Sequence, residues 1–249
     1  MKCVVLAAGY ATRLYPLTEN FPKPLLEVNG MSILDHLLRD IDKIEAVDGH
    51  VIISNHRYYD KFVEWESKNT AIKKPIEIVD DGSVSNETRL GAVKDIQFAI
   101  EKCGLEGQDL LIIAGDNLID FSFKQFVDFA EEHNSSAVMC DYEEDIEELR
   151  RCGVMIPDEN MRVVSMEEKP KEPKSNWCVG PFYFYRAEDL PLIKQGIEEG
   201  CKTDAPGSLV CYMCEKTDIY AYEMPGKRYD IGDLKSYEYV KTVYKHTAI

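Results

Sequence analysis

Apolar residues in the first half of the chain fall into short runs separated by longer segments of helical periodicity. The short runs have the length of buried strands and lie at residues 2–7, 50–54, 76–79 and 110–114. Segments 57–68 and 90–102 predict helices, and a third helix begins after Ser32, where Asp35 makes a capping pair. This alternation predicts a mainly parallel sheet with helices on both faces. Ligands of such a sheet bind beyond the carboxyl ends of its strands.

The second half has a different pattern, in which predicted strands follow one another directly. Residues 154–157, 162–166 and 179–185 predict strands joined by a turn and by a loop rich in proline and lysine. We expect them to form a small antiparallel extension with its own binding surface. Residues 219–224 predict a further strand, and residues 234–246 predict a closing helix.

The charge balance narrows the partners that this chain can bind. Lysine and arginine number 29 against 45 acidic residues in 249, which gives a net charge of −16. Such a surface repels nucleic acid polymers and anionic membranes, so neither is expected as a partner. The acidic run 143–148 predicts the solvated face of a helix and not a metal site. The N-terminal apolar stretch is too short for a signal peptide and no run reaches membrane-span length, so a cytoplasmic protein is expected.

The cysteines fit this expectation as buried free thiols. Four of the eight lie in or beside apolar stretches, where free cysteine behaves as a small hydrophobe: Cys3, Cys103, Cys140 and Cys178. Cys211 and Cys214 form a CxxC motif that no second CxxC or HxxxH accompanies. Zinc or redox use stays open for this pair, but two cysteines on one face of a core helix account for it better.

A loop of small residues follows the first predicted strand, in LAAGYATRLYPLTENFPKPLLEV at residues 6–28. Such a loop exposes backbone N–H groups to an anion. It is not a P-loop, since no Gly-Lys-Ser/Thr follows Gly9, and not a dinucleotide fingerprint, since Ala11 and Leu14 occupy the later glycine positions. On these residues alone, Gly9 also fits a simple turn, and Lys23 fits a surface lysine after a proline bend.

This stretch resembles the N-terminal signature of the sugar-1-phosphate nucleotidyltransferases, most closely the glucose-1-phosphate thymidylyltransferase-like members. Their pattern is LAAG-x-GTRL-x-P-x-T followed by PKP-L-x-x-V. Three later segments agree in order and spacing: AGDN at 114–117, EEKP at 167–170 followed by G-x-F/Y-x-F/Y, and YDIGD at 229–233. The resemblance therefore spans almost the whole chain.

The resemblance implies an α/β fold with a Rossmann-like, mainly parallel mixed sheet covered by helices on both faces, plus a small antiparallel sugar-binding extension. It implies a single domain over residues 1–249, with a nucleotide-binding half at 1–135 and a sugar-phosphate-binding half with the closing helix at 136–249. The implied activity joins a sugar-1-phosphate to an NTP and releases pyrophosphate, which is a step in nucleotide-sugar biosynthesis.

The resemblance also assigns roles to individual residues. Its nucleotide-binding residues are Leu6, Ala8, Gly9, Arg13 and Gly91. The catalytic pair is Arg13, which would reach the β- and γ-phosphates, and Lys23, which would bridge the α-phosphate and the attacking sugar phosphate. A lysine suits this bridge as a compact point charge, and an arginine suits a bidentate grip on pyrophosphate. Prolines on both sides of Lys23 restrict its backbone.

Two further sets of residues complete the implied site. Asp116 and Asp230 would hold Mg²⁺, which takes one or two carboxylates together with substrate phosphates. The sugar-phosphate-binding residues are Gly153, Glu168, Lys169 and Val179. Taken alone, Asp116 also fits a turn cap, Asp230 fits a partner of Arg228, and the EEKP segment fits a solvated turn.

Three departures from the family pattern leave questions open. Ala11 replaces a loop glycine, which is tolerable where φ is not positive. Pro181 predicts an edge strand. The segment DDGSVSNETRL lacks the glutamine- and proline-bearing loop that contacts thymine in the thymidylyltransferases, so the base is left between dTTP and UTP.

Glucose-1-phosphate is the first expectation for the sugar. The alternative functions are a cytidylyltransferase for a non-sugar phosphate such as phosphocholine, and a catalytically silent nucleotide-sugar sensor. Homo-oligomerisation is left open.

Overall fold

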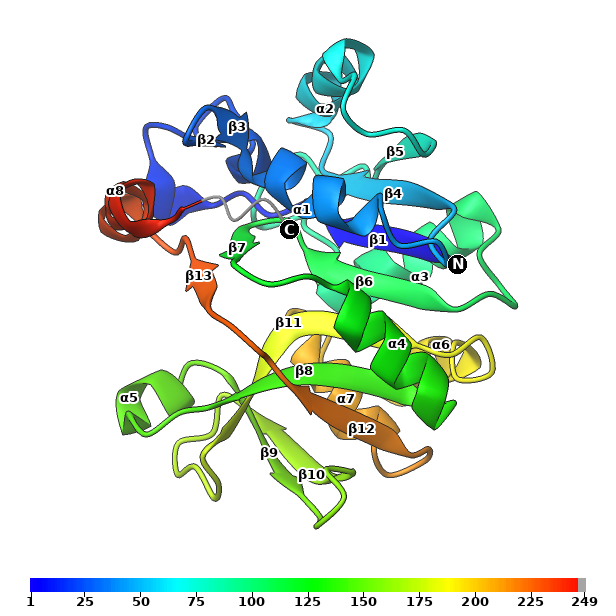
Figure 1. Ribbon diagram of the computed structural model, residues 1–249. Helices are drawn as coiled ribbons and strands as arrows, with labels where there is room; N and C mark the ends of the chain where they lie inside the picture. The colour runs from blue at the N-terminus through cyan, green and yellow to red at the C-terminus, as the bar shows by residue number, and fades with distance from the viewer. Residues whose placement is uncertain (246–249) are drawn as a thin grey trace. The chain divides into compact units, whose positions relative to one another are not determined.

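The computed structural model describes residues 1–245 (Figure 1). Its contacts divide the chain into two compact units, neither of which is continuous in sequence. The first unit contains residues 1–89, 113–124 and the chain from Pro225 onward; the second contains residues 90–112 and 125–224. His246, the last residue of the predicted closing helix, lies outside the described residues.

The first unit is built on parallel strands. Its elements are β1 (Lys2–Leu6), the 3₁₀ helices η1 (Thr12–Leu14) and η2 (Lys23–Leu25), β2 (Glu27–Val28), β3 (Met31–Ser32), α1 (Ile33–Ile41), β4 (Gly49–Ser54), α2 (Tyr59–Lys68), β5 (Ile76–Asp80), β7 (Asn117–Ile119), β13 (Arg228–Asp230) and α8 (Leu234–Val243). β4 pairs in parallel with β1 on one side and with β5 on the other. The three strands predicted at 2–7, 50–54 and 76–79 and the closing helix are confirmed as β1, β4, β5 and α8, with small shifts at their ends.

Helix α1 shows why these residues fold as the sequence predicts. The Ser32 hydroxyl accepts a hydrogen bond from the Asp35 backbone N–H at 3.0 Å, which caps the helix as expected. The residues at helical spacing after it form one fully buried stripe: Ile33, Leu34, Leu37, Leu38 and Ile41. Helix α2 begins at Tyr59, two residues later than predicted.

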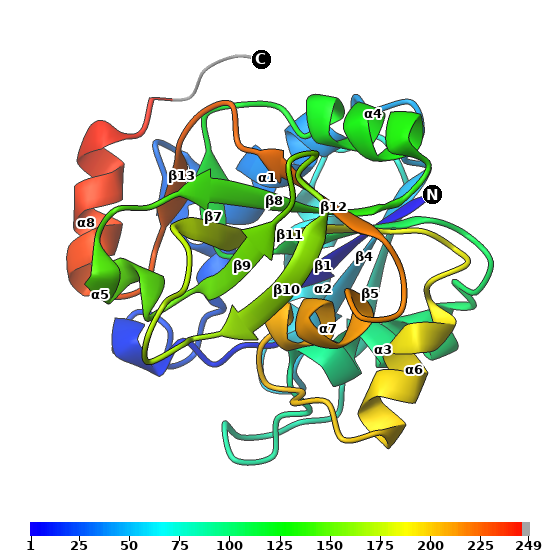
Figure 2. The same cartoon turned by 90° about the horizontal axis from the view of Figure 1, so that it is seen from below.

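The second unit combines both strand directions. Its elements are α3 (Ala92–Cys103), most of β6 (Leu110–Ala114), nearly all of α4 (Lys124–His133), β8 (Ser136–Tyr142), α5 (Ile146–Leu149), β9 (Gly153–Pro157), β10 (Val163–Glu168), β11 (Trp177–Tyr185), α6 (Pro191–Glu198), α7 (Gly207–Met213) and β12 (Ile219–Glu223). Its strand order is β10-β9-β11-β6, and β8 pairs with β11 and β12 (Figure 2). The predicted antiparallel extension is confirmed in β9, β10 and β11, whereas β12 lies parallel to β8.

The prediction that Pro181 marks an edge strand is wrong. Strand β11 has a neighbour on each side, so it is an interior strand. The register between β11 and β8 shifts between Val179 and Tyr183, and Pro181 lies within this irregular stretch. A proline has no N–H to donate, so a break in the ladder accommodates it inside a sheet.

The acidic run and the CxxC motif both fold close to expectation. Within the acidic run, only Ile146–Leu149 is helical, and the exposed Glu147 and Glu148 form ion pairs with Arg150 and Arg151. Cys211 lies in helix α7 and Cys214 directly follows it, both as free thiols. Among residues 1–245, no helix has the length and apolar character that a membrane crossing requires.

Candidate functional site

The loop after β1 is held by side chains on either side of Gly9. The buried Asn55 donates from Nδ2 to the Ala8 carbonyl at 2.9 Å. The Tyr10 hydroxyl donates to the Ser83 carbonyl at 2.9 Å, which ties the loop to the segment after β5. Gly9 itself is exposed, with no atom near the position of an added Cβ. The loop is therefore fixed on both sides of an open glycine, an arrangement that suits close approach of a ligand to the backbone.

Ala11 has a positive φ, the backbone conformation in which its replacement of glycine is least tolerable. Its φ is 45° and its ψ is 44°, in the left-handed region. A left-handed backbone places Cβ close to the following carbonyl, which costs an L-residue on the order of 1 kcal/mol. The Ala11 carbonyl accepts hydrogen bonds from the Thr18 hydroxyl at 2.8 Å and from the Leu14 N–H at 2.9 Å. These contacts hold the strained turn in place.

Lys23 is not a surface lysine. It lies in η2 between Pro22 and Pro24, and it is 6% exposed. Its Nζ donates to Asp116 Oδ2 at 2.8 Å. Partial burial opposes the ionisation of Asp116, but the charges of Lys23 and Arg228 outweigh it, so the pKa of Asp116 is lowered. The two residues therefore form a charged pair at the carboxyl end of β6.

Gly115, which the sequence analysis did not single out, makes this pair possible. Its N–H donates to the Leu6 carbonyl at 3.0 Å. An added Cβ would lie 2.9 Å from Val5 Cγ1 and 3.4 Å from Pro24 Cγ, closer than packing allows. Only glycine lets the chain pass so near β1 and Pro24 just before Asp116. The glycine of the AGDN segment was the available signal.

Asp230 and Arg13 meet at a second glycine of the first unit. Strand β13 pairs with β7, and this register puts Asp230 opposite Asn117, the residue after Asp116. An ideal Cβ built on Gly232 lies 3.8 Å from Asp230 Oδ2 and 3.9 Å from Arg13 Nη2. Arg228 donates to Asn117 Oδ1 at 2.9 Å, so it is bound to the asparagine. The first unit thus pairs Lys23 with Asp116 and places Asp230 and Arg13 around Gly232.

Gly91, predicted to lie beside the nucleobase, belongs to the second unit. It is the N-cap of α3, with φ 92°. The next residues are tied down through backbone hydrogen bonds, including one from the Val93 N–H to the Thr203 carbonyl at 3.0 Å. Helix α3 starts two residues after the predicted start because Gly91 caps it.

The four predicted sugar-phosphate residues come together in the second unit. Val179 pairs with Gly153 across β11 and β9, and Gly153 pairs with Glu168 across β9 and β10. These three residues therefore form one row across three strands, and Lys169 follows directly after Glu168. An added Cβ on Gly153 would collide with the Met166 side chain and lie 3.0 Å from Glu168 Oε2. Gly207 is packed against the same carboxylate. It was not predicted as a site residue because it lies far from Glu168 in the sequence.

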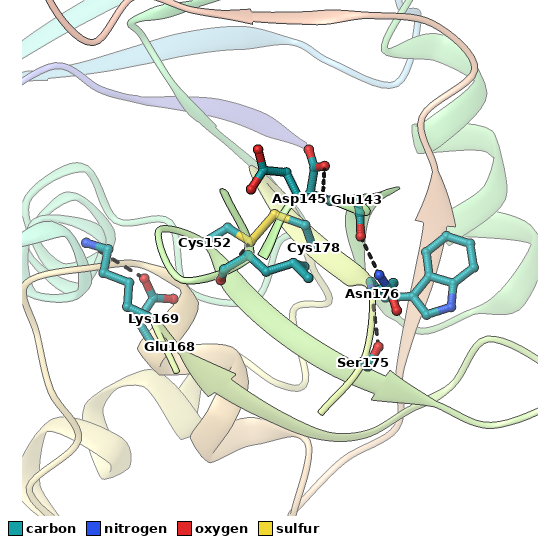
Figure 3. The surroundings of a disulfide bond; sticks show 10 residues. Glu143, Asp145, Cys152, Glu168, Lys169, Ser175, Asn176 and Cys178 are labelled. Carbon is teal, nitrogen blue, oxygen red and sulfur yellow. Dashed lines mark hydrogen bonds and ion pairs between the residues drawn. A yellow bond between two sulfur atoms is a disulfide. The ribbon is translucent and has the colours of Figure 1, made fainter. Parts of the chain in front are cut away.

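Glu168 and Lys169 have unusual surroundings for an EEKP turn. The Glu168 side chain is 17% exposed, and burial raises its pKa, although the charges of Lys169 and Lys202 oppose the rise. Lys169 Nζ lies 4.0 Å from Glu168 Oε1 (Figure 3). Lys169 has a left-handed φ of 52°, a backbone state that ordinary side chains adopt rarely and that concentrates at functional sites. The interpretation as a simple solvated turn does not fit a buried glutamate.

The prediction that Cys178 is a free thiol is wrong. Cys178 is bonded to Cys152, with 6.0 Å between their Cα atoms (Figure 3). Cys178 pairs with Val154 across β11 and β9, so Cys152 lies near it at the start of β9. The pairing depends on which strands are neighbours, and a single sequence does not reveal that. Cys3, Cys103 and Cys140 form no disulfide, as predicted.

Comparison with known proteins gives one consistent result. Residues 2–246 match a family model described as nucleotidyl transferase. The mannose-1-phosphate guanylyltransferase catalytic subunit beta of Drosophila pseudoobscura pseudoobscura is 29% identical over 237 residues, or 95% of this chain and 60% of the relative. The glucose-1-phosphate adenylyltransferase of Fervidobacterium nodosum is 24% identical over 94% of this chain and 59% of the relative. The chain thus spans about 60% of the length of these curated relatives.

A solved structure supports the same fold. The crystal structure of a UDP-glucose pyrophosphorylase complexed with UDP-glucose superposes with a TM-score of 0.80 and 21% sequence identity. The match covers 98% of this chain and 97% of the other. The predicted α/β fold with a mixed sheet is confirmed.

Proposed function

We propose, because this chain belongs to the nucleotidyl transferase family, that it transfers a nucleotidyl group from an NTP to a sugar-1-phosphate. The observation that carries the proposal is the ion pair between the buried Lys23 and the partly exposed Asp116, located beside the loop that follows β1. A lysine is seldom buried without a partner or a task, and here the partner is itself a candidate metal ligand.

In this reaction an oxygen of the sugar phosphate forms a bond to the α-phosphorus. The bond from that phosphorus to the oxygen it shares with the β-phosphate breaks, and pyrophosphate leaves. Two polyanions must be held together, so positioning and charge neutralisation supply most of the catalysis. We assign the bridging charge to Lys23 and the grip on the leaving phosphates to Arg13, whose guanidinium is exposed on η1.

Asp116 and Asp230 are suited to hold Mg²⁺. The pKa of Asp116 is lowered by Lys23 and Arg228 despite partial burial, so its carboxylate stays ionised, and the register of β13 puts Asp230 opposite Asn117, the residue after Asp116. Mg²⁺ takes one or two carboxylates and completes its shell with phosphate oxygens and water, so these two residues would suffice on the protein side. When bound, Mg²⁺ would neutralise charge on the triphosphate.

We assign the sugar phosphate to the row of Gly153, Glu168 and Val179 with Lys169. The Glu168 carboxylate would accept hydrogen bonds from sugar hydroxyls, and the Lys169 ammonium would bind the phosphate. Lys169 is more than half exposed, which leaves its charge available to a ligand.

For the substrate pair we propose glucose-1-phosphate with dTTP or UTP as the first combination to test. The relatives named above are mannose-1-phosphate guanylyltransferases and glucose-1-phosphate adenylyltransferases, so purine nucleotides and mannose-1-phosphate belong in the same test. Magnesium dependence, a cytoplasmic location and homo-oligomerisation stay predictions.

The deciding experiment measures pyrophosphate release for five nucleotides (ATP, GTP, CTP, UTP and dTTP) against several sugar-1-phosphates and phosphocholine, with Mg²⁺. We expect turnover with at least one sugar phosphate, and Asp116→Asn protein serves as the inactive control. Turnover with CTP and phosphocholine alone would favour the cytidylyltransferase. Nucleotide or sugar binding without turnover in any combination would favour the sensor.

A further inference from the structure

We propose that the Cys152–Cys178 disulfide is a redox-sensitive positioning element for sugar-phosphate binding, so that its reduction weakens the site. The proposal rests on the function proposed above. The two half-cystines immediately precede two of the residues assigned to the sugar phosphate: Cys152 precedes Gly153, and Cys178 precedes Val179.

The sheet register shows what the bond holds. Val179, Gly153 and Glu168 lie opposite one another across β11, β9 and β10. Because β9 and β11 are antiparallel, Cys152, just before Gly153, and Cys178, opposite Val154, lie on either side of this row, so the disulfide spans the row diagonally where β9 begins. It is thus a covalent tie across a row otherwise joined by backbone hydrogen bonds, and those bonds are weakest at strand ends.

Lys169 is attached to the same tie. Its backbone N–H donates to the Cys152 carbonyl at 3.0 Å. This bond holds Lys169 in its left-handed conformation directly after β10, and that conformation determines where the ammonium points. Figure 3 shows Glu168 and Lys169 turned toward each other near the disulfide. If Cys152 is released, both the start of β9 and the Lys169 backbone lose a restraint.

The bond is open to reduction from one side. Cys178 is 6% exposed and packs with Leu149 and Val154, whereas Cys152 is only partly buried. A dithiol can attack Cys152 Sγ as a thiolate and release Cys178 as the leaving thiolate. Its second thiol then displaces Cys152, so the dithiol is oxidised to a disulfide while the protein gains two electrons and two protons.

Coupling of this kind is reciprocal. If the disulfide form binds sugar phosphate more tightly by some factor, bound sugar phosphate must favour the disulfide over the dithiol by the same factor. Couplings between protein sites commonly amount to roughly 5- to 150-fold in affinity. A nucleotide held by the first-unit residues alone should show no such coupling.

The test compares full-length protein in its disulfide form and after equilibration with dithiothreitol, with the state of the bond confirmed by mass spectrometry. Reduction is expected to raise the KM for glucose-1-phosphate by roughly 5-fold or more while the KM for the nucleotide changes little. Reoxidation should restore it. The Cys152→Ala/Cys178→Ala variant should show the raised KM of the dithiol form in both conditions, whereas Cys201→Ser, which alters a free thiol of the same unit, should respond like wild type.

Hydrogen exchange gives a second measurement that does not depend on the substrate. The Lys169 amide should exchange faster after reduction, whereas the Gly115 amide, bonded to the Leu6 carbonyl in the first unit, should not change. Unchanged Lys169 exchange and an unchanged sugar-phosphate KM in verified dithiol protein would overturn the proposal. Faster exchange without any turnover would instead leave the positioning role standing and contradict the proposed function.

Discussion

Two carboxylates at the candidate sites lie in opposite electrostatic surroundings. Asp116 is 39% exposed and paired with a buried lysine, and its pKa is lowered by Lys23 and Arg228 despite partial burial. Glu168 is 17% exposed and packed against Gly153 and Gly207, and burial raises its pKa. The first arrangement keeps a negative charge available for a cation. The second arrangement, around Glu168, suits hydrogen bonding between the carboxyl group and the neutral hydroxyl groups of a sugar.

The two regions also differ in what holds them. The Lys23–Asp116 pair depends on backbone turns, namely the prolines around Lys23 and the close passage at Gly115. The Glu168 row depends on strand register and on a covalent bond. Substitutions in the first region should therefore act mainly on catalysis, and those in the second mainly on substrate affinity.

The largest expected effect comes from Asp116→Asn. The substitution removes the proposed metal ligand and leaves the buried Lys23 without its charged partner, so turnover should fall by roughly 10³-fold or more. EDTA should abolish wild-type activity, and added Mg²⁺ should restore it. Asp120→Asn is a matched control in the same unit, since an amide oxygen can still accept the Lys227 N–H bond that Asp120 accepts at 2.6 Å. Full activity of Asp116→Asn at limiting Mg²⁺ would remove Asp116 from the site.

Lys23→Ala should lower kcat by roughly 10²–10³-fold with little change in nucleotide KM, because the bridging charge matters most in the transition state. Lys23→Met keeps the stem of the side chain and should lose as much activity. Lys23→Arg should rescue it only in part, since a planar fork cannot replace a point charge between two phosphates. Lys227→Ala, an exposed lysine of the same unit, is the control. A loss confined to nucleotide affinity would contradict a bridging role.

Lys169→Ala tests the second region. It should raise the KM for the sugar phosphate far more than that for the nucleotide, because its charge meets only one substrate. Alanine and lysine have a similar energetic cost at a φ of 52°, so the variant tests the loss of the ammonium group and not a change in backbone strain. Lys174→Ala, exposed in the same loop, should leave both KM values unchanged. Equal effects of Lys169→Ala on the two KM values would contradict the assignment of Lys169 to sugar-phosphate binding.

The pH dependence should distinguish the two carboxylates. Since burial raises the pKa of Glu168, it takes up a proton at a higher pH than an exposed glutamate would. Sugar-phosphate affinity should therefore be highest above the raised pKa and fall as the pH is lowered through it. Glu168→Gln should bind less tightly at neutral pH and lose this dependence, which titration calorimetry from pH 7.5 to 5 would measure. If the affinity of Glu168→Gln for the sugar phosphate showed the same pH dependence, another group would be responsible for it.

The smallest expected effect concerns the first loop. Ala11→Gly removes the left-handed strain but adds freedom to the unfolded chain, so we expect a net stabilisation of roughly 0.5 kcal/mol. Thermal melting should show a rise of about 1–2 °C. Ala8→Gly changes a buried residue outside the left-handed region and should lower the melting temperature. A destabilised Ala11→Gly protein would mean that the methyl group packs in the loop.

Local patterns in the sequence predicted much of the first unit. Parallel strands buried on both faces appear in the sequence as apolar runs, and Ser32 with Asp35 marks a helix start.

Two helices of the second unit were not predicted. Helix α6 has a usable signal in Pro191 at its first position. Helix α4 has only three fully buried apolar positions, Phe126, Val127 and Ala130, and β8 follows it almost at once, so neither pattern stands out.

Features that depend on pairing between distant strands could not be predicted. The disulfide, the interior position of β11 and the contact of Gly207 with Glu168 all follow from which strands and helices are neighbours. The left-handed turn at Ala11 follows from the loop's hydrogen bonds, which involve Thr18 as well as Leu14. The burial of Lys23 was decided by Asp116, which comes much later in the chain.

The discontinuous path of the chain has a consequence for the order in which a ribosome completes the protein. Lys23 and Asp116 both emerge before residue 125, but β13 with Asp230 emerges only after all of the second unit. A nascent chain that stops at Met224 contains Lys23 and Asp116 but lacks the second acidic residue, Asp230. The charged centre is therefore finished last, when the sugar-phosphate residues have already been synthesised.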